Sequence, residues 1–498
     1  MKAPLSLLLF CWILSIPTLT ANNIQVNNVA LTGQNASAGF VLVEFDLSWE
    51  NSWRVSAGPS NWDAAWVFIK YRVDNGDWQH ASLNYVDGSG TGDGHTVPSG
   101  ATINTSSDSV GVFIYRDSPG SGNADYQGVQ LQWNYANAGV QVDNIVDIQV
   151  FAIEMVYIPE SAFSVGDGFL GTADDKFFTS FGSLVGIPYQ INSEDPIPVG
   201  TESNELYYEV TSPANNADQQ GPIPAAFPKG FQAFYMMKYE VTEGQWICYF
   251  NTLTDTQKVT QDITSSNGKG TDATVVGNTI VYTTGFATSS APTRTLTYAR
   301  WILSSAYLDW AGLRPFTELE FEKACRGTND VVPGEYAWGD TTFNSSPLTV
   351  QNLAAEDEII TNPGLGLGNM NSSDADIGFP LRSGVFAASA VNKNRRETGG
   401  SFYGIMELSA NTLENAISVG SPNERAFTGI EGDGAIDSNG LANVPNWPDP
   451  QGVGPRAFRG GSYGLDEERA RVADRFISNV ASNTLPFQSG CRGARTAD

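Results

Sequence analysis

Runs of apolar residues with the spacing of β-strands fill the first third of the chain. Residues 40–49 alternate apolar and polar side chains in their second half, which is the pattern of a half-buried strand. Gly, Asn, Asp and Ser separate such runs, and no helical period competes with them. Residues 22–153 are therefore predicted to form an all-β sandwich of about seven to nine strands. The other strand-like runs cover residues 66–73, 110–116, 129–135 and 145–151.

Residues 1–21 have the composition of a secretory signal peptide. Lys2 precedes an apolar run over residues 5–16, and small residues lead up to Ala21. The run is shorter than the roughly 20 apolar residues that a membrane-spanning helix needs, and no later run reaches that length. We therefore expect a mature protein without a transmembrane segment, which begins near Asn22 and is secreted or displayed at the cell surface.

The charge of the chain limits its partners. The 498 residues include 54 acidic and 27 basic side chains, which give a formal net charge of −27. Such a charge disfavours binding to nucleic acid and to anionic membranes, because both repel an acidic surface. The expected partner is instead a protein or carbohydrate ligand at the cell surface, or a second copy of the chain.

Histidine and cysteine are scarce in this sequence. His80 and His95 both lie in the N-terminal part, so neither a histidine-rich zinc or iron site nor a histidine-dependent triad is expected in the C-terminal half. After the signal peptide the chain keeps Cys248, Cys325 and Cys491. Three cysteines cannot all pair, which leaves two alternatives: three free thiols, or one disulfide and one free thiol.

The sequence pattern changes near residue 154, where a second domain over residues 154–498 is predicted to begin. Helices are expected over residues 242–253 and 298–311. A third helix opens at Thr317, which can form a capping box with Glu320. The polar, Thr- and Gly-rich stretch of residues 254–290 is expected to be an insertion on the surface. This mixture predicts an α+β domain that is rich in loops.

Six sequence blocks follow one another in this second domain. They read MKYEVTEGQW, WAGLRPFTELEFEKACRG, YAWG, YGIMELSANTLE, FRGGS and GCRGAR, at residues 237–246, 310–327, 336–339, 403–414, 458–462 and 490–495. In content and order the blocks resemble the formylglycine-generating enzyme (sulfatase-modifying factor) family. The resemblance implies the family's large, loop-rich variant of the C-type-lectin-like fold for the second domain.

The resemblance also implies an oxidase that binds copper through two cysteines, which lie five positions apart shortly after the Arg-Gly-Gly-Ser turn. Soft thiolate ligands hold Cu(I), so this chemistry needs cysteine at both positions. The corresponding residues here are Leu465 and Ala470. Iron-binding relatives use histidines, and residues 154–498 contain none. Copper and iron are therefore not expected, and no catalytic residue is assigned. An enzyme of the same family with unrecognised chemistry stays open as an alternative.

A structural calcium ion is the cofactor that the resemblance supports. Glu407 and Glu414 stand where the family uses side-chain oxygens. Leu408, Ala410 and Thr412 stand where it uses backbone carbonyls. Hard oxygen ligands of this kind suit Ca²⁺.

A second calcium site of the family would lie earlier in the chain. It would use Asn352 and Leu353 together with one aspartate, for which both Asp374 and Asp376 qualify. Intact family blocks beside absent copper ligands favour a secreted, non-catalytic binding or structural protein. A component of a surface secretion or gliding assembly is a further alternative.

Three other features bear on binding. Arginines near the C-terminus are expected to pair with the acidic residues beside them, and residues 476–488 are a candidate recognition surface. A group of tryptophans is either core packing or a stacking platform for carbohydrate. The tryptophans are Trp49, Trp53, Trp62 and Trp66, and the arginines are Arg459, Arg469, Arg471 and Arg475.

Overall fold

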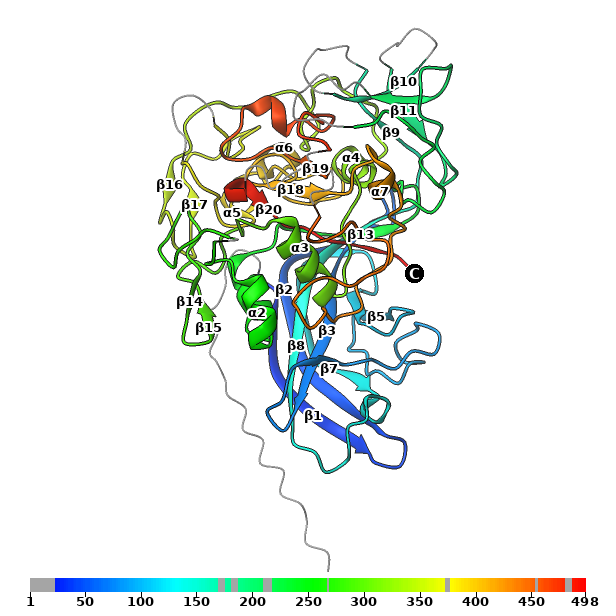
Figure 1. Ribbon diagram of the computed structural model, residues 1–498, viewed down its shortest axis with the longest axis vertical. Coiled ribbons are helices and arrows are strands. Elements are labelled where there is room, and N and C mark those ends of the chain that lie inside the picture. The colour runs from blue at the N-terminus through cyan, green and yellow to red at the C-terminus, as the bar shows by residue number, and fades with distance from the viewer. Residues whose placement is uncertain are drawn as a thin grey trace, which may run out of the picture.

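The computed structural model describes residues 23–168, 175–180, 187–208, 217–266, 268–371, 377–452, 456–479 and 486–498. Within these ranges the chain is mostly β, with seven α-helices (Figure 1). The predicted signal peptide, residues 1–21, lies outside the described residues. None of the described helices combines the length and the apolar character that crossing a bilayer requires.

Two sheets contain the long strands of the molecule. The smaller sheet joins β1 (Gln25–Asn35), β2 (Phe40–Arg54) and β7 (Gly120–Trp133) in antiparallel order, and the short helix η1 (Tyr135–Ala138) follows β7. In Figure 1 the long blue and cyan strands fill the lower half of the view. The larger sheet has the order β21 (Ala494–Thr496), β13 (Phe234–Met237), β8 (Val146–Ile158), β3 (Asp63–Val73), β6 (Val112–Arg116) and β5 (Ala101–Thr105), with β4 (Gln79–His80) paired to β3.

Strand β2 shows why these two sheets pack together. Val43, Phe45 and Leu47 are buried, whereas the residues between them are partly exposed, so one face of the strand is apolar. That face belongs to the same buried cluster as Val67 and Ile69 of β3. Removing this apolar surface from water stabilises the two sheets against each other.

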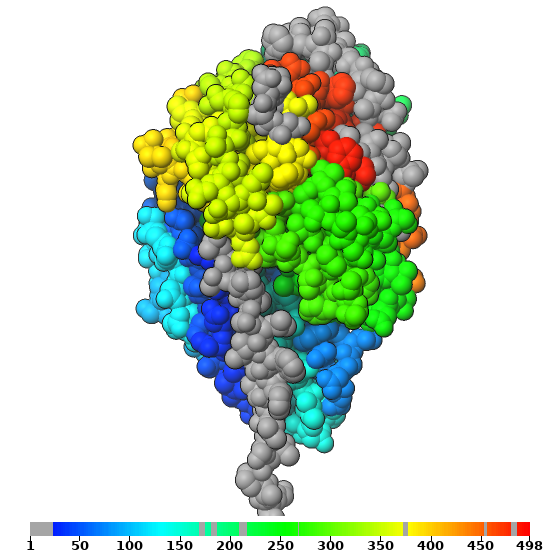
Figure 2. Space-filling model, turned by 90° about the vertical axis from the view of Figure 1, so that its left-hand side faces the viewer, coloured from blue at the N-terminus to red at the C-terminus, as the bar shows by residue number. Residues whose placement is uncertain are grey.

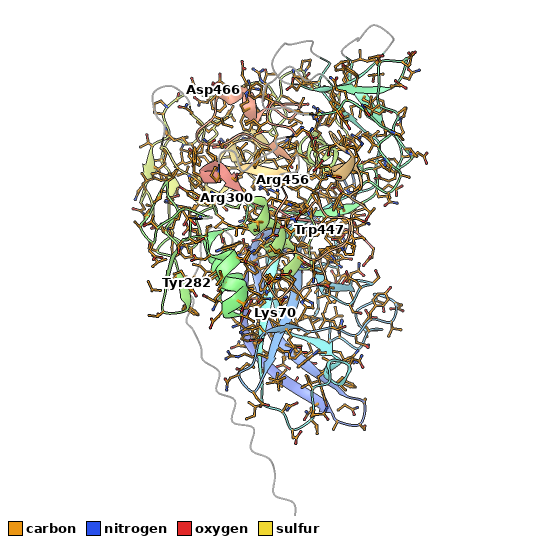
Figure 3. All side chains as sticks on the ribbon, in the orientation of Figure 1. Lys70, Tyr282, Arg300, Trp447, Arg456 and Asp466 are labelled. Atoms are coloured by element: carbon orange, nitrogen blue, oxygen red, sulfur yellow. The ribbon has the colours of Figure 1, made fainter. Side chains whose placement is uncertain are left out.

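Strand β3 is buried on both faces because the C-terminal part of the chain covers its other side. Trp66 and Phe68 belong to a second cluster together with Trp310. Trp66 Nε1 donates a hydrogen bond to the carbonyl of Ala311 at 2.8 Å. Lys70 Nζ, labelled in Figure 3, donates to the carbonyl of Trp310 at 2.7 Å. The N-terminal strands and the C-terminal helices therefore share one core.

Strand β8 joins the N-terminal and C-terminal parts of the chain. Its residues 146–156 pair with β3, and its residues 155–158 pair with β13. The domain boundary predicted between residues 153 and 154 falls inside this strand. A single sheet therefore continues through the position where a boundary was expected.

Three helices begin at the capping boxes that their sequences contain. Thr242 caps α1 (Glu243–Phe250), Thr254 caps α2 (Asp255–Gln261) and Thr317 caps α4 (Glu318–Arg326). The helix α3 (Trp301–Trp310) is almost entirely buried. The remaining helices are α5 (Val385–Ser389), α6 (Arg395–Thr398) and α7 (Pro422–Arg425).

Residues 254–290, expected to be an insertion on the surface, contain regular elements and are anchored in the core. These elements are α2 and a hairpin of β14 (Val281–Thr283) and β15 (Phe286–Thr288). Ile263 follows the end of α2 and Ile280 directly precedes β14. Both are 1% exposed and belong to the central cluster. A few apolar residues in a polar stretch are enough to anchor it.

Short elements complete the C-terminal part, which Figure 2 shows in green and yellow beside the blue and cyan strands. Strand β18 (Leu413–Ala416) lies between β19 (Ala457–Arg459), which is antiparallel to it, and β20 (Ser489–Gly490), which is parallel. The other short pairs are β9 (Phe163–Val165) with β11 (Tyr189–Ile191), β10 (Phe177–Thr179) with β12 (Leu206–Tyr208), and β16 (Val350–Gln351) with β17 (Ile359–Ile360). Two 3-10 helices are η2 (Glu467–Ala470) and η3 (Pro486–Gln488).

Candidate functional site

The loop of residues 407–414 leads into β18 and packs against the Arg-Gly-Gly-Ser turn. The amide of Ala410 donates to the carbonyl of Gly460 at 2.6 Å. Glu407, Ala410 and Asn411 have φ values of 55°, 88° and 69°, which non-glycine residues rarely adopt. Such conformations persist only where the surrounding structure holds them, so this loop is fixed by its neighbours rather than by its own preference.

Two of the three predicted carbonyl ligands come together beside Gly460. The carbonyl oxygens of Leu408 and Thr412 lie 3.1 and 3.9 Å from the point that a Cβ atom on Gly460 would occupy. Gly460 has a φ of 89°. Glycine is therefore favoured there for its conformation, and a Cβ atom would also press on the carbonyl oxygen of Leu408.

Glu407 is a buried carboxylate with one unused oxygen. Its Oε1 accepts a hydrogen bond from the amide of Gly384 at 3.0 Å, while its Oε2 is buried without a partner among the described residues. Burial and the nearby carboxylate of Glu240 raise the pKa of Glu407 to about 8. A cation beside Glu407 would favour its ionised form.

Glu414 is also buried and also has one unused oxygen. Arg492 donates to its Oε1 from Nε at 2.7 Å, whereas its Oε2 has no hydrogen-bond partner in the described part of the chain. Arg492 also donates to the carbonyls of Met237 and Met406, at 2.8 and 2.9 Å. Burial raises the pKa of Glu414 to about 7, although Arg492 opposes the shift.

Glu240 is a member of this site that the sequence interpretation missed. Its carboxylate accepts hydrogen bonds from the amide and the hydroxyl of Thr412 at 3.0 and 2.6 Å. It also accepts from Asn411 Nδ2 at 2.6 Å and from the hydroxyl of Thr295 at 3.0 Å. Glu240 therefore fixes the loop of residues 407–414 through hydrogen bonds to Asn411 and Thr412. The available signal was its position in the first of the six sequence blocks.

The arrangement offers a cation hard oxygen atoms of two kinds. Two are the unpartnered carboxylate oxygens of Glu407 and Glu414, and two are the carbonyls of Leu408 and Thr412. No three acidic, histidine or cysteine side chains are placed to hold a metal in the part of the chain that the structure describes. A Ca²⁺ ion at this loop would therefore depend on backbone carbonyls, as Ca²⁺ sites often do. These types of oxygen donor suit calcium, and the assignment stays a prediction.

The second predicted calcium site is not assembled by the described residues. Asn352 and Leu353 are exposed, and Asn352 Nδ2 donates to Asp357 at 2.8 Å. Asp374 and Asp376 lie outside the described residues. The second site accordingly stays a prediction.

Leu465 and Ala470, at the positions of the family's copper cysteines, pack in two different apolar clusters. Ala470 is 1% exposed and clusters with Tyr336 and Trp338. Leu465 packs against the cluster that contains Phe458. Ala470 fills space in the interior, whereas Leu465 is partly buried at the edge of its cluster.

The structure decides between free thiols and a disulfide for the three cysteines. Cys248, Cys325 and Cys491 are all free thiols, so no disulfide joins them. Cys325 and Cys491 are buried, and Cys248 is exposed. Burial raises the pKa of the Cys325 and Cys491 thiols far above their usual value, which keeps them protonated and unreactive.

The arginines near the C-terminus follow their expected pairing in part. Arg469 pairs with Asp474 at 2.8 Å, as expected for neighbours in sequence. Arg459 and Arg475 instead reach across to α4, where both bind Glu318. The expectation of purely local pairs was wrong for these two residues.

The candidate recognition surface at residues 476–488 is only partly described. Residues 480–485 lie outside the described ranges. Ser478, Asn479 and Gln488 are buried, and Phe476 is half-buried. The described part of this stretch therefore packs inward more than the sequence suggested.

The tryptophan group favours core packing over a carbohydrate platform. Trp49 and Trp66 are 1% and 0% exposed. Trp62 stacks on Tyr157 with ring centroids 3.9 Å apart. The ammonium of Lys238 lies 5.0 Å from the ring centre of Trp53. These neighbours occupy aromatic faces that a sugar would need.

Comparisons with known proteins identify a family and structural neighbours. Residues 201–497 match the family described as Sulfatase-modifying factor enzyme 1-like domain. No curated protein sequence matches the chain. Among solved structures, the chain is similar to Treponema denticola variable protein 1, with 13% sequence identity and a TM-score of 0.31. That similarity covers 70% of this chain and 96% of the other.

Proposed function

This chain belongs to the family of sulfatase-modifying factor enzyme 1-like domains, and on this premise we propose that it is a secreted, non-catalytic binding or structural protein of the cell surface. Its N-terminal strands form a β-sandwich in this proposal, and the remainder is a loop-rich variant of the C-type-lectin-like fold. A calcium ion in the loop of residues 407–414 stabilises the second part.

The carbon side chains of Leu465 and Ala470, of which Ala470 is buried and Leu465 partly buried, are the observation that carries the non-catalytic assignment. Copper chemistry in this family needs two thiolates held together, and soft sulfur ligands cannot be replaced by carbon. Both positions here contribute to apolar clusters. The three cysteines that the mature chain keeps lie at other positions, and two of them are buried with strongly raised pKa values.

A direct assay tests the absence of oxidase activity. The full chain is incubated with Cu(I), oxygen, a thiol reductant that supplies two electrons per turnover, and a peptide that contains Cys-x-Pro-x-Arg. Mass spectrometry follows the conversion of the peptide cysteine to formylglycine. The expected result is an unchanged peptide. Conversion above the rate of a copper-only control would overturn the assignment.

Calcium-dependent melting tests the proposed ion. A ligand that binds only the folded state raises stability by about 2.7 kcal/mol at a concentration of 100 times its Kd. We expect Ca²⁺ to raise the melting temperature of the native chain and to leave that of Glu407→Gln nearly unchanged. Glutamine keeps an acceptor for the amide of Gly384 but removes the charge.

The matched control for this charge change is Glu160→Gln. Glu160 is exposed and lies outside the loop of residues 407–414, so this variant should keep the full calcium response. An equal calcium shift in Glu407→Gln and in the native chain would rule out the loop as the ion's site.

A further inference from the structure

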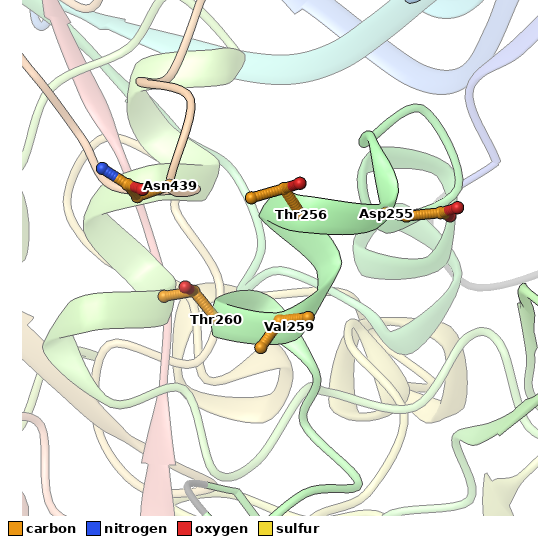
Figure 4. A pocket seen from close by; sticks show the side chains of 5 residues that line it. All are labelled: Asp255, Thr256, Val259, Thr260 and Asn439. Carbon is orange, nitrogen blue, oxygen red and sulfur yellow. The ribbon is translucent and has the colours of Figure 1, made fainter.

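The cavity on α2 offers a ligand little charge. It has a volume of about 420 Å³, and Figure 4 shows Asn439 facing this helix across it. Asp255 is the only charged residue in its lining, and the apolar side chain of Val259 is 75% exposed. No feature of this face distinguishes one ligand from another. Charged side chains that the fold leaves without a partner are more specific indicators of a ligand.

Arg300 and Arg456 lack the carboxylate partners that buried arginines of this chain usually have. Their guanidinium groups form no hydrogen bond or ion pair with any of the described residues. Acceptors are not scarce, because the chain carries 54 acidic against 27 basic side chains. By contrast, glutamates bind the guanidinium groups of Arg294, Arg314, Arg326, Arg459, Arg475 and Arg492.

Both unpaired arginines, which are labelled in Figure 3, belong to the region where α3 begins. Arg300 is the N-cap residue of this helix, and Trp301 is its first residue. Arg456 directly precedes β19, and its Cζ lies 5.5 Å from the centre of the Trp301 ring. The neighbouring strand β18 is tied to the same place, because Asn415 Nδ2 donates to the carbonyl of Ala299 at 3.1 Å.

The start of α3 is uncapped and electropositive. No side chain accepts a hydrogen bond from its first turn. The amides of Leu303 and Ser304 donate to the carbonyl of Arg300, whereas those of Trp301 and Ile302 have no acceptor among the described residues. The helix dipole adds partial positive charge at this end, where a cationic side chain is unfavourable. An anion at this position would relieve the repulsion between these positive groups.

The polar ends of both arginines can be reached from solvent. Arg456 is only 4% exposed, and Arg300 is partly buried. Among the fully enclosed polar atoms without a partner, Arg300 contributes only its Nε and Arg456 contributes none. The other nitrogens of the two guanidinium groups also lack a partner, so they must keep contact with solvent. Burial lowers the pKa of Arg300, and it lowers the pKa of Arg456 to about 10.

Glu424 of α7 is the carboxylate whose charge acts on Arg456. It forms no ion pair with Arg456 in the described part of the chain, and the hydroxyl of Ser421 donates to its Oε2. Burial raises the pKa of Glu424 to about 7, so part of its negative charge is lost near neutral pH. Glu424 therefore leaves the charge of Arg456 largely uncompensated.

We propose that the start of α3 binds a doubly charged oxyanion, sulfate or phosphate, through Arg300 and Arg456. Two guanidinium charges match a dianion, and guanidinium N–H groups donate well to its oxygens. The free amides of Trp301 and Ile302 supply further donors, as helix N-termini do for such ions. This site goes beyond the proposed function and does not depend on the loop of residues 407–414.

Titration calorimetry on the full chain tests this site. The probes are sulfate and, at mildly alkaline pH, phosphate, with chloride holding the ionic strength constant and acetate as a singly charged comparison. We expect both dianions to bind at millimolar concentration or below. Acetate should bind about 10-fold more weakly, as expected when a charge-assisted hydrogen bond is lost. Equal binding of acetate, or no binding of either dianion at millimolar concentration, would overturn the proposal.

Two variants locate the binding. Arg300→Gln and Arg456→Gln each remove one unpaired charge, and we expect each to weaken sulfate binding by about 10-fold or more. Arg72→Gln is the matched control, because Arg72 already pairs with Asp147, and this variant should bind sulfate like the native chain. Unchanged affinity in both Arg300→Gln and Arg456→Gln would refute the location.

The melting temperature of Arg300→Gln separates binding from a role in packing. In chloride alone, this variant should melt at or above the native temperature, because it removes a repelled charge from the positive end of α3. In sulfate, the native chain should gain stability and the variant should gain less. A variant that melts lower in chloride and gains as much in sulfate would show that Arg300 serves the fold instead.

The same calorimetry separates two sources of the ligand group. Glycerol phosphate carries the phosphate on an alcohol, whereas inorganic phosphate is the free ion. Binding of both supports a phosphate ester of a partner as ligand, and binding of inorganic phosphate alone supports a free ion. Either result requires Arg456, so an affinity for both compounds that survives Arg456→Gln would contradict the assignment.

Discussion

Arg475 donates to both carboxylate oxygens of Glu318, from Nε at 2.8 Å and from Nη2 at 3.0 Å, although 157 residues separate the two in sequence. Both side chains are 0% exposed. Arg459 binds the same carboxylate and also that of Glu322. Burial by itself would raise the pKa of Glu318, but the two guanidinium groups outweigh it and lower this pKa to about 2.

Removing Arg475 should therefore destabilise the protein strongly. Breaking one side of a buried ion pair costs about 3–5 kcal/mol, because the remaining charge stays buried. We expect Arg475→Met to lower the free energy of unfolding by about this amount in urea denaturation. Arg72→Met is the matched control, because Arg72 and Asp147 form a pair that is more than a third exposed at each end. Arg72→Met should lower the free energy of unfolding by less than about 1 kcal/mol. Equal losses in the two variants would contradict the importance of the buried pair.

The N-terminal strands should lose stability in mild acid because of His95. Its Nδ1 accepts from the amide of Gln132 at 3.0 Å, so the folded state holds the ring neutral. Burial lowers the pKa of His95 from 6.5 to about 4, and the unfolded chain therefore binds more protons than the folded chain between these values. A shift of that size corresponds to a loss on the order of 3 kcal/mol as the pH falls from about 6.5 to 4.

The variant His95→Asn isolates this effect. Asparagine keeps an oxygen acceptor near the position of Nδ1 and does not titrate. The free energy of unfolding, measured at several pH values, should fall less between pH 6.5 and 4 in the variant than in the native chain. Parallel curves for the two proteins between pH 6.5 and 4 would show that His95 is not the titrating group.

A comparison of two glycine variants separates backbone strain from an effect on calcium binding. Gly460 and Gly100 have φ values of 89° and 83°, but a Cβ on Gly100 would meet nothing within 4 Å. A left-handed conformation costs a non-glycine residue about 1–2 kcal/mol, so both Gly460→Ala and Gly100→Ala should lose at least this much stability. Only Gly460→Ala brings a Cβ to 3.1 Å from the carbonyl oxygen of Leu408, so only it should also lose the calcium-dependent rise in melting temperature. A retained calcium response in Gly460→Ala would place the ion elsewhere.

Cutting the chain at the predicted domain boundary should yield no independently folded halves. A cut between residues 153 and 154 divides β8, whose pairing with β3 runs across the cut and whose pairing with β13 begins at Met155. Separate production of residues 23–153 and 154–498 should give insoluble or non-cooperatively melting material, because each half exposes strand edges and core surface. Production of both halves in one cell should restore a soluble complex. Cooperative melting of each half alone would show that the shared sheet is dispensable.

Local patterns predicted the local features of this fold. The alternation in residues 40–49 identified β2 and its buried face, and the capping box at Thr317 and Glu320 identified the start of α4. Both features depend on residues a few positions apart, and sequence periodicity reports such distances directly. Motif order identified the family over most of the second part of the chain.

Contacts between distant segments were beyond the reach of these patterns. Nothing near Arg475 indicates that its partner is Glu318 rather than one of the acidic residues beside it. Glu240 likewise shows its role only when Thr412 and Asn411 are brought to it from later in the chain. Strand β8 is continuous because β3 and β13 pair with it along its length. The change in local composition near residue 154 suggested a domain boundary there instead.

The pairing of β13 with β21 has a consequence for the order of events during synthesis. About 260 residues separate the paired positions Phe234 and Thr496. At a translation rate of roughly 5–20 residues per second, the outer edge of β13 waits about 13–50 seconds before its partner strand exists. During that interval an unpaired strand edge is available to other nascent chains, so export before folding or a chaperone bound to this edge would protect the growing protein.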